Sequence, residues 1–431
     1  MTTQVPSGSG LAPKIWSDML YAQAVKAPTP LKTLSAGAPT IDKATGILRR
    51  QSSTGMPIVR INDLDKTAGE TVRMDCAQVV KVRAVMGDQN AEGLGASMKF
   101  SQQDIKIDMA TLPVSVGGKM TQKRLQFDLR TLALAQLAGS VPAFLWQRAL
   151  TQMAGARGEM DGSDWVLPLA SDPDFASQMV NPVMAPTYNR HYVCDGSTLV
   201  QGGQQLSSID NTDILLLSHI DELAALFDEV TIKMAPIKIP GDPAAGDDPI
   251  KGVLMVDPLV WDTILTDKST GNNFRQWQSA ALERAKYGDM ARHPLFAGGP
   301  LLWNGVLVKK MSQGVRFSAG ASVNYVSQAN RYTATESQVT VNAAITASYQ
   351  ISRSLFLSAQ ALGVAGGANT GSGSPYTMLE NSENFGRNLE IAGEIIGAEQ
   401  KVRFSVPNET GQAEPTDFGV MFIDSVTRRR V

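Results

Sequence analysis

A long period-two stretch that leads into a long apolar helix pattern constrains this chain more than any other feature of its sequence. From Thr71 to Val85, mostly apolar side chains occupy the even positions, while charged side chains such as Arg73 occupy odd ones. Such alternation predicts a strand with one buried face and one exposed face. A glycine-rich turn over residues 87–95 and a returning strand around Ile105 complete the expected hairpin.

The length of this hairpin matters for how its apolar face is buried. Each arm has about 15 residues, which corresponds to ~50 Å of extended chain. Typical strands have only about 5–6 residues, and a two-stranded ribbon cannot bury an apolar face by itself. We therefore expect another surface to cover this face, and a second copy of the same chain is the first candidate.

A helix pattern follows the hairpin, from Lys119 to Met153, with leucines at three- and four-residue spacing and a stop at Gly155. A continuous helix of ~35 residues would span ~50 Å. Pro142 has no backbone N–H and clashes with the preceding turn. The sequence therefore predicts a kink or break between residues 139 and 143.

Composition excludes several classes of protein. The chain has 431 residues, 43% hydrophobic residues and a formal net charge of −2, so no global basic field is available to grip nucleic acid. Two cysteines provide no disulfide framework and are typical of a reducing compartment, and no secretory signal is apparent. The uncharged stretch 131–147 is shorter and more polar than a membrane span of ~20 apolar residues, so we expect no membrane segment.

The sequence contains no recognisable catalytic, metal-binding or phosphate-binding motif. His191 and Cys194 form an isolated His-x-x-Cys, which is weak evidence for zinc without a second pair. The run Gly366–Ser372 partly mimics a phosphate-binding loop but lacks its lysine. We therefore predict no catalytic residue, no metal and no cofactor. This outcome favours a structural role over an enzyme.

The remaining segments mix helix and strand signals without regular βαβ alternation, which indicates an α+β fold. Residues 1–68 are rich in Pro, Ser, Thr and Gly and predict an arm, for which order on assembly and disorder are equally open. Residues 311–348 are polar with weak alternation and predict an exposed β insertion at the surface. The other expected elements are helices near 214–229, 261–265 and 274–287 and strands near 253–256, 301–308, 389–397, 401–404 and 418–423.

Several short motifs occur in a fixed order between Gly69 and Ile423. Besides the hairpin turn, they are Gly118–Arg124, Phe127–Arg130, Asn189–His191, His293–Phe296, Ser358–Leu362 and Asp417–Val420. Together they resemble the major capsid proteins of tailed bacteriophages, and specifically the coat family of the N-four-type podophages.

The resemblance implies a Hong Kong 97-like capsid fold with five parts. They are an N-terminal arm (1–68), an extended loop made by the long hairpin (69–117), a peripheral domain with a spine helix (118–209), an axial domain (210–380) and C-terminal strands that return to the peripheral domain (381–431). By the same analogy the extended loop lies over a neighbouring subunit. The expected contact at its tip comprises Gly87, Asp88, Glu92, Gly93 and Leu94.

The resemblance also implies a function. Hexamers and pentamers of such a protein tile an icosahedral shell that encloses double-stranded DNA, and this shell is assembled in the host bacterial cytoplasm. Implied partners are other copies of the chain, a portal, and decoration or scaffolding proteins, with no membrane contact. Two alternatives stay open: another virion or surface-binding protein that uses residues 311–348, and an enzyme of unfamiliar type with a site near His191 and Cys194.

Overall fold

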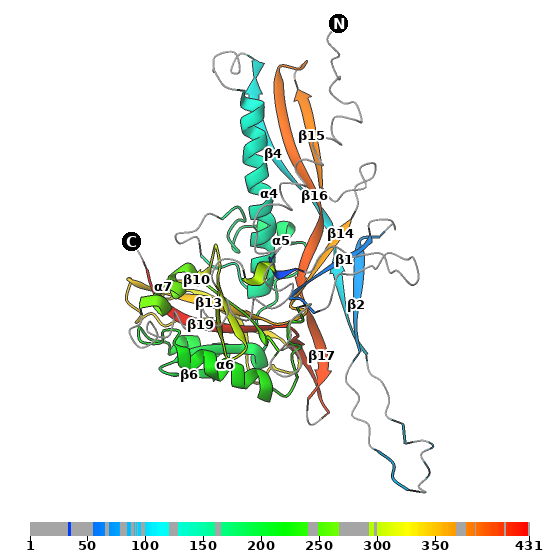
Figure 1. Ribbon diagram of the computed structural model, residues 1–431. Helices are drawn as coiled ribbons and strands as arrows, with labels where there is room; N and C mark the ends of the chain where they lie inside the picture. The colour runs from blue at the N-terminus through cyan, green and yellow to red at the C-terminus, as the bar shows by residue number, and fades with distance from the viewer. Residues whose placement is uncertain are drawn as a thin grey trace.

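One long strand, β16 (Asn388–Lys401), organises the taller half of the molecule. It pairs antiparallel with β15 (Tyr376–Glu383) on one edge and with β4 (Asp108–Gly118) on the other. These three strands form a tall ribbon, called the three-stranded ribbon below (Figure 1). The last residues of β16 pair with β14 (Leu362–Gly367), which pairs in parallel with β1 (Ile58–Leu64) to complete a five-stranded sheet.

The computed structural model describes most of the chain beyond its first third. The described residues are 33–35, 55–64, 69–77, 84–87, 90, 92, 94–95, 100–119, 128–159, 165–239, 249–266, 293–296, 300–367, 376–383, 385–408 and 411–429. The predicted helix at 274–287 lies outside these residues, as does nearly all of the predicted arm at 1–68 apart from 33–35 and 55–64.

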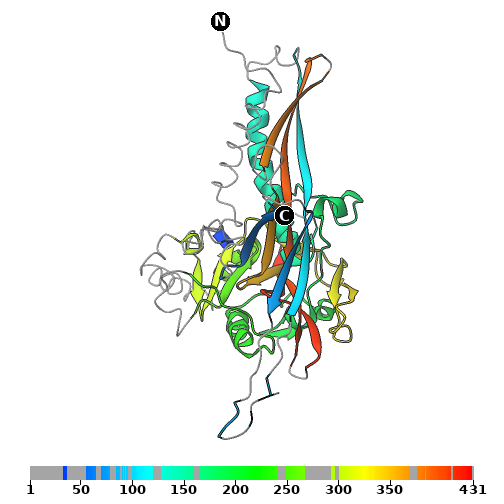
Figure 2. The same ribbon diagram turned by 90° about the vertical axis from the view of Figure 1, so that its right-hand side faces the viewer.

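Helix α4 (Leu129–Ala154) runs along one face of the three-stranded ribbon, as the side view shows (Figure 2). Alternate residues of the strands face the helix, as the period of two requires. Ile391 and Val116 pack against Leu137 higher on the helix, and Ile395 packs against Val141 and Phe144 below. The helix therefore buries a stripe of apolar side chains against the sheet along its length.

The expected break at Pro142 is wrong. Helix α4 continues through Pro142, which is buried. Proline removes one hydrogen bond from the helix interior, a cost of about 3 kcal/mol relative to alanine. Leu137 on one side of the proline and Phe144 on the other are both packed on the ribbon, so tertiary packing holds the two halves in line.

The predicted start of the helix at Lys119 is also wrong for α4. This helix begins at Leu129 because Asp128 is its N-cap, with Oδ1 accepting a 3.0 Å hydrogen bond from the Arg130 N–H. The stop at Gly155 is confirmed: this residue has φ of 65° and its N–H donates to Thr151 O.

The second half of the molecule is a globular lobe built on an eight-stranded sheet (Figure 1). Its strand order is β6-β5-β19-β13-β7-β9-β8, and β10 pairs with β13. The strands are β5 (His191–Asp195), β6 (Thr198–Gln201), β7 (Gly252–Val256), β8 (Leu301–Trp303), β9 (Val306–Lys310), β10 (Val315–Phe317), β13 (Tyr349–Leu357) and β19 (Val420–Arg428).

Both faces of this sheet are covered, which explains why β7 and β19 are nearly continuous apolar runs in the sequence. Helices α6 (Leu217–Glu229) and α7 (Pro258–Thr266) cover one face, where Leu254 and Met421 point. The C-terminal end of α4 lies on the other face, where Met255 and Phe422 point. The lower end of α4 is thus shared by the two halves of the molecule.

Shorter elements surround these two sheets. Two hairpins are formed by β11 (Ser322–Val326) with β12 (Glu336–Thr340) and by β17 (Arg403–Pro407) with β18 (Ala413–Asp417). A third pairs β2 (Thr71–Ala77) with β3 (Phe100–Lys106). Helix α5 (Asp174–Met179) lies beside α4, and short 3-10 turns are η1 (Tyr188–Arg190), η2 (Gly203–Ser207) and η4 (Pro294–Phe296).

Apart from the start and continuity of α4, most of the expected elements are present, with two further differences. The strand expected at 301–308 is a pair, β8 and β9, because Asn304 and Gly305 both have positive φ and form a tight turn. The expected exposed insertion at 311–348 is only partly exposed. Its β10 belongs to the eight-stranded sheet, and β11 and β12 each turn one face into the core, with Val323 and Val339 buried.

The domain boundaries expected from the sequence stay a prediction, and strand pairing joins segments across them. Strands β5 and β6 share a sheet with β7 and β9, and β19 lies beside β13. Strands β14 and β15, by contrast, belong to the sheet of β4 and β16.

We predict that Gly155→Ala lowers the free energy of unfolding by more than Gly87→Ala does. Both glycines have φ near +65°, where an L-residue costs about 1–2 kcal/mol. A Cβ at Gly155 would also lie 2.5 Å from the Met184 carbonyl oxygen, whereas a Cβ at Gly87 meets nothing within 4 Å. Urea denaturation of the two variants measures the difference, and equal losses would contradict the prediction.

Candidate functional site

The root of the projecting hairpin, formed by β2 and β3, follows the alternation seen in the sequence. Val72 is buried and Met74 half-buried, whereas Arg73 and Asp75 are exposed, so the predicted strand is confirmed over residues 71–77. Val72 and Ile105 pack against the five-stranded sheet of the same chain. The expectation that another copy covers the apolar face is therefore wrong for the root. A second copy can be needed only for the part of the hairpin beyond it.

Side-chain amides fasten this root to the body of the molecule. Gln103 Nε2 donates to Lys401 O at 2.8 Å, and Gln103 Oε1 accepts from the Arg403 N–H at 2.8 Å. Asn181 pairs in the same way with both backbone groups of Lys106, at 3.0 and 2.9 Å. Each side-chain amide thus both donates to and accepts from the backbone, as a residue on a neighbouring strand would. These bonds fix the direction in which the hairpin leaves the body.

The far part of the hairpin exposes apolar side chains. Met86 is 74% exposed, Leu94 63% and Phe100 61%. Of the predicted contact residues, Gly87, Glu92 and Leu94 are described and exposed, while Asp88 and Gly93 lie outside the described residues. Large apolar side chains that extend from a soluble body on a narrow hairpin are typical of a surface that another molecule covers.

The top of the three-stranded ribbon is a second such place. The turn between β15 and β16 holds Phe385, which is fully exposed and has a positive φ of 56°. Leu379 on β15 and Met109 on β4 are also exposed. The exposed large apolar side chains are thus concentrated on the elements that project from the body.

Buried charges join the two halves of the molecule where α4, β16, β13 and β19 meet, a region called the joint below. Arg353 on β13 makes two 2.8 Å hydrogen bonds to the carboxylate of Asp424 on β19. Its third nitrogen donates at 3.0 Å to Ala154 O, one of the carbonyl groups left free at the C-terminal end of α4. One side chain therefore links the C-terminal end of α4 to the centre of the eight-stranded sheet.

His191 belongs to the joint. Its Nε2 lies 2.7 Å from Asp424 Oδ2, and both side chains are fully buried. Burial lowers the pKa of His191 below its ordinary value, so the neutral ring donates from Nε2. Burial alone would raise the pKa of Asp424, but Arg353 and His191 together hold it well below its usual range. The carboxylate is therefore ionised and satisfied by its neighbours.

The end of β16 adds a second buried pair to the joint. Lys401 Nζ lies 3.0 Å from Asp417 Oδ2 and donates to Met184 O at 2.9 Å. Arg403 Nε donates to the other carboxylate oxygen of Asp417 at 2.8 Å. Burial lowers the pKa of Lys401 to about 7, although Asp417 acts in the opposite direction.

The geometry gives no support to an enzyme site at His191 and Cys194. Both are fully buried, and His191 is engaged by Asp424. Burial raises the pKa of the Cys194 thiol well above its ordinary value, so it stays protonated and unreactive. Within the described ranges, no group of three His, Cys, Asp or Glu residues could hold a metal ion, and no helix is long and apolar enough to cross a membrane.

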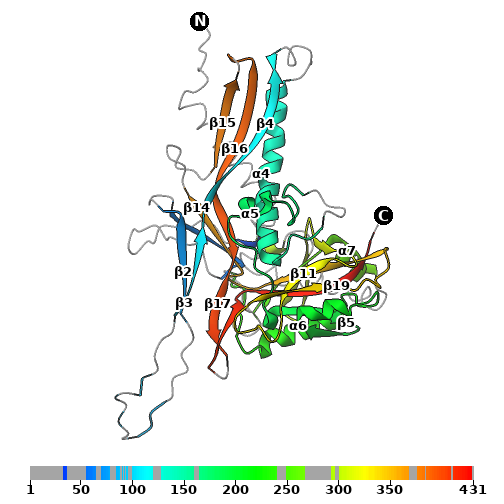
Figure 3. The same cartoon turned by 180° about the vertical axis from the view of Figure 1, so that it is seen from behind.

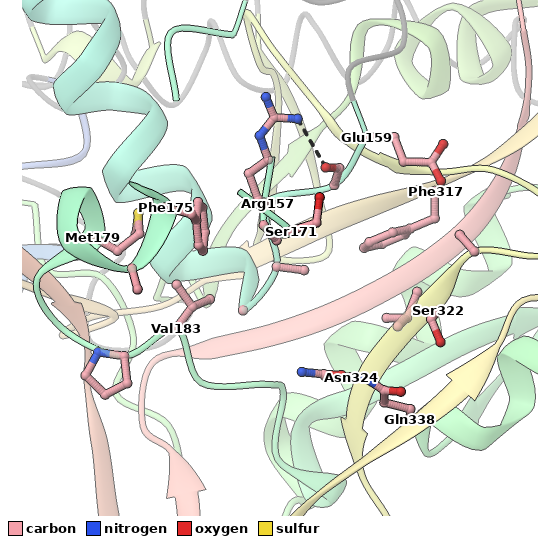
Figure 4. A pocket seen from close by; sticks show the side chains of 18 of the residues that line it. Arg157, Glu159, Ser171, Phe175, Met179, Val183, Phe317, Ser322, Asn324 and Gln338 are labelled. Carbon is pink, nitrogen blue, oxygen red and sulfur yellow. Dashed lines mark hydrogen bonds between the residues drawn. The ribbon is translucent and has the colours of Figure 1, made fainter. Parts of the chain in front are cut away.

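A cavity of about 800 Å³ lies beside the joint, between the end of α4, helix α5 and strand β11 (Figure 4). Its walls combine apolar side chains such as Phe175 and Phe317 with polar groups of Ser322, Asn324 and Gln338. None of these residues stood out in the sequence, because they come from segments that are far apart along the chain.

The sequence matches the family model described as phage capsid protein over residues 4–429. The chain belongs to this family. As a major capsid protein it forms the shell of the virion, where projecting elements with exposed apolar side chains are expected to meet other subunits. No curated protein matches the chain.

Solved structures show which fold this capsid protein has. The capsid of Ralstonia phage GP4 matches with a TM-score of 0.66 and 22% identity, covering 91% of this chain and 95% of that one. The cyanophage Pam1 capsid matches with a TM-score of 0.57 and 14% identity (90% and 95% covered). The capsid of Helicobacter pylori bacteriophage KHP30 matches at 0.52 and 10% (86% and 88% covered). The expected α+β, Hong Kong 97-like fold is confirmed.

Sequence reasoning missed the residues that hold the capsid protein together. Asp424 interrupts the apolar run of β19, and Lys401 is the fully buried last residue of β16. A lone charge in a buried strand requires a partner, and that was the available signal. The identity of each partner depends on segments far apart in the chain, so the sequence could not supply it.

We predict that Gln103→Ala loosens the hairpin root without unfolding the subunit. The variant loses two hydrogen bonds worth about 1 kcal/mol each, and these bonds serve the hairpin alone. Hydrogen exchange should therefore rise in β2 and β3 and stay unchanged in β13 and β19. Gln102→Ala is the matched control because Gln102 is exposed on the same strand. Equal exchange in both variants would contradict the anchoring role.

We predict that Lys401 makes the subunit more stable as the pH rises from about 7 to 9. The pKa of Lys401 is about 7 when folded, against ~10.4 for a free lysine. In this window the unfolded chain binds the proton and the folded chain does not, so the free energy of unfolding rises, by at most ~1.4 kcal/mol per pH unit. Lys401→Met should flatten this slope in urea titrations, and an unchanged slope would refute the prediction.

Proposed function

We propose that this capsid protein assembles into hexamers and pentamers of an icosahedral shell that encloses double-stranded DNA. In this proposal the tip of the hairpin, at Gly87, Asp88, Glu92, Gly93 and Leu94, contacts a neighbouring subunit. The observation that carries it is a hairpin fixed at its root by Gln103 and Asn181 and exposing Met86 and Leu94 at its far end. A fixed root with an apolar end suits a contact between subunits and serves no purpose inside one subunit.

Symmetry gives the physical logic of such a shell. One contact that is weak in a single pair of subunits is repeated around every ring of a closed assembly, so many weak contacts give a stable container. The net charge of −2 is compatible with a wall that encloses DNA without binding it tightly. We place assembly in the host bacterial cytoplasm, with a portal and decoration or scaffolding proteins as further partners.

We also propose the finer assignment to the coat family of the N-four-type podophages. In this assignment the arm is 1–68, the extended loop 69–117, the peripheral domain 118–209, the axial domain 210–380, and 381–431 the C-terminal strands. The long α4 beside the three-stranded ribbon supports a spine helix in a peripheral domain. The structural role of this family supports a protein without catalytic activity.

The decisive experiment removes the tip of the hairpin. Deletion of residues 88–98 should leave the subunit folded, because the root and both sheets are held by other residues. Assembly should fail, so size-exclusion chromatography and negative-stain microscopy should show free subunits where the parent chain gives shells, tubes or capsomers.

Two substitution variants separate a specific contact from a general loss of solubility. Met86→Ser with Leu94→Ser should impair assembly, because both side chains are exposed on the hairpin. Val166→Ser with Leu169→Ser is the control, since these apolar residues are exposed on the body. Normal shells from the tip deletion would overturn the proposed contact.

A further inference from the structure

Two short segments of the body carry the anchors of the projecting hairpin, 401–403 and 181–187. Two backbone groups of 401–403 bind the side-chain amide of Gln103, each at 2.8 Å. In 181–187, the side-chain amide of Asn181 binds both backbone groups of Lys106, at 3.0 and 2.9 Å. Strand β3 lies beside β17 and the end of β16, so both anchors act on the root itself (Figure 3). The hold on the root therefore depends on how these two segments are joined to each other.

A buried carboxylate, that of Asp417, joins the two segments. From the first segment, Lys401 Nζ lies 3.0 Å from Asp417 Oδ2, and Arg403 Nε donates to Oδ1 at 2.8 Å. From the second, the Thr187 N–H donates to Asp417 Oδ2 at 3.0 Å, and Thr187 Oγ1 accepts from the Asp417 N–H at 3.2 Å. Lys401 Nζ also donates to Met184 O at 2.9 Å, so the lysine bonds to the second segment directly.

The amine of Lys401 lies in a buried cluster that is already balanced in charge. The charged and titratable groups around it come from five strands and are Asp417 (β18), Arg403 (β17), Arg353 (β13), Asp424 (β19) and His191 (β5). Each carboxylate of this set is paired with one arginine of the set. Glu399, two residues before Lys401 on β16, is likewise paired with Arg148. Because His191 is neutral, the ammonium form of Lys401 adds a positive charge in excess, and an excess buried charge is costly.

The uncharged amine of Lys401 avoids this cost and keeps its hydrogen bonds to Met184 O and Asp417 Oδ2. Burial lowers the pKa of Lys401 to about 7, so the uncharged form predominates above neutral pH and the ammonium forms below it. Lys401 is fully buried and contacts 181–187 through Met184. Separation of 401–403 from 181–187 is therefore the opening that lets water reach the ammonium.

We propose that Lys401 and Asp417 form a proton-sensitive clasp for the projecting hairpin: it holds 401–403 to 181–187 while the amine is uncharged, and proton uptake loosens the hairpin root. The direction follows from linkage. An opened root exposes Lys401 to water and binds the proton more tightly than the closed root does, so a fall in pH raises the opened population. The clasp acts within one subunit, so it requires no contact with a neighbour and is independent of the proposed assembly.

Hydrogen exchange of unassembled full-length subunits tests the clasp at pH 8.5 and pH 7.0. Protection, the ratio of the intrinsic exchange rate to the measured rate, corrects for the effect of pH on the exchange chemistry. It should fall in β2 and β3 as the pH is lowered, by at most about tenfold per pH unit, the limit for one proton. The β11–β12 hairpin is the internal control, because it packs on η2 and should keep its protection. Equal protection of β2 and β3 at the two pH values, or equal losses in both hairpins, would overturn the proposal.

Two matched substitutions assign the pH dependence to Lys401. Lys401→Met removes the amine and keeps an unbranched apolar side chain, so the protection of β2 and β3 should no longer change with pH. Lys309→Met is the control: Lys309 on β9 also has a pKa lowered by burial, and this variant should keep the pH dependence of the parent chain. A dependence that survives in Lys401→Met, or one that is lost in both variants, would overturn the clasp. The comparison of the two hairpins in the parent chain needs no substitution, so it decides the proposal even where a variant does not fold.

Discussion

The buried pair of Arg353 and Asp424 is the interaction on which the rest of the structure depends. It lies between the central strands β13 and β19 of the eight-stranded sheet, and the same arginine binds the last carbonyl of α4. Loss of one partner would leave a charge buried without compensation, which typically costs 3–5 kcal/mol. The angle between the lobe and the tall ribbon is therefore fixed by directional bonds as well as by packing, which suits a subunit that must present its projecting parts accurately.

The hairpin shows how one element can be rigid at one end and available at the other. Its root lies on the five-stranded sheet, with Val72 and Ile105 buried and Gln103 bonded to the backbone next to β16. Beyond Ala77 and before Phe100, Met86, Glu92 and Leu94 are exposed. A shell subunit benefits from this division because a fixed direction lowers the entropy lost when the tip finds its neighbour.

Local patterns predicted much of the fold. The sequence predicted the alternation at 71–77, the apolar run of β7 and the helix that ends at Gly155, since each depends on neighbours in sequence. The continuity of α4 through Pro142 was not, because packing on the ribbon outweighs one missing hydrogen bond. The sequence did not predict the burial of part of residues 311–348. Exposed polar residues on one face of these strands dominate the composition, although the alternate valines, Val323 and Val339, face the core.

By itself, the sequence determined the class of fold, the presence of a long hairpin and a long helix, and, through its ordered motifs, the capsid family. These follow from periodicity and local composition. Only the tertiary structure decided what covers the hairpin root and which charges meet in the joint. Such facts depend on contacts between different strands and helices, some of them hundreds of positions apart, as with Gln103 and Lys401. The three-dimensional path of the chain selects these partners, and no local pattern does.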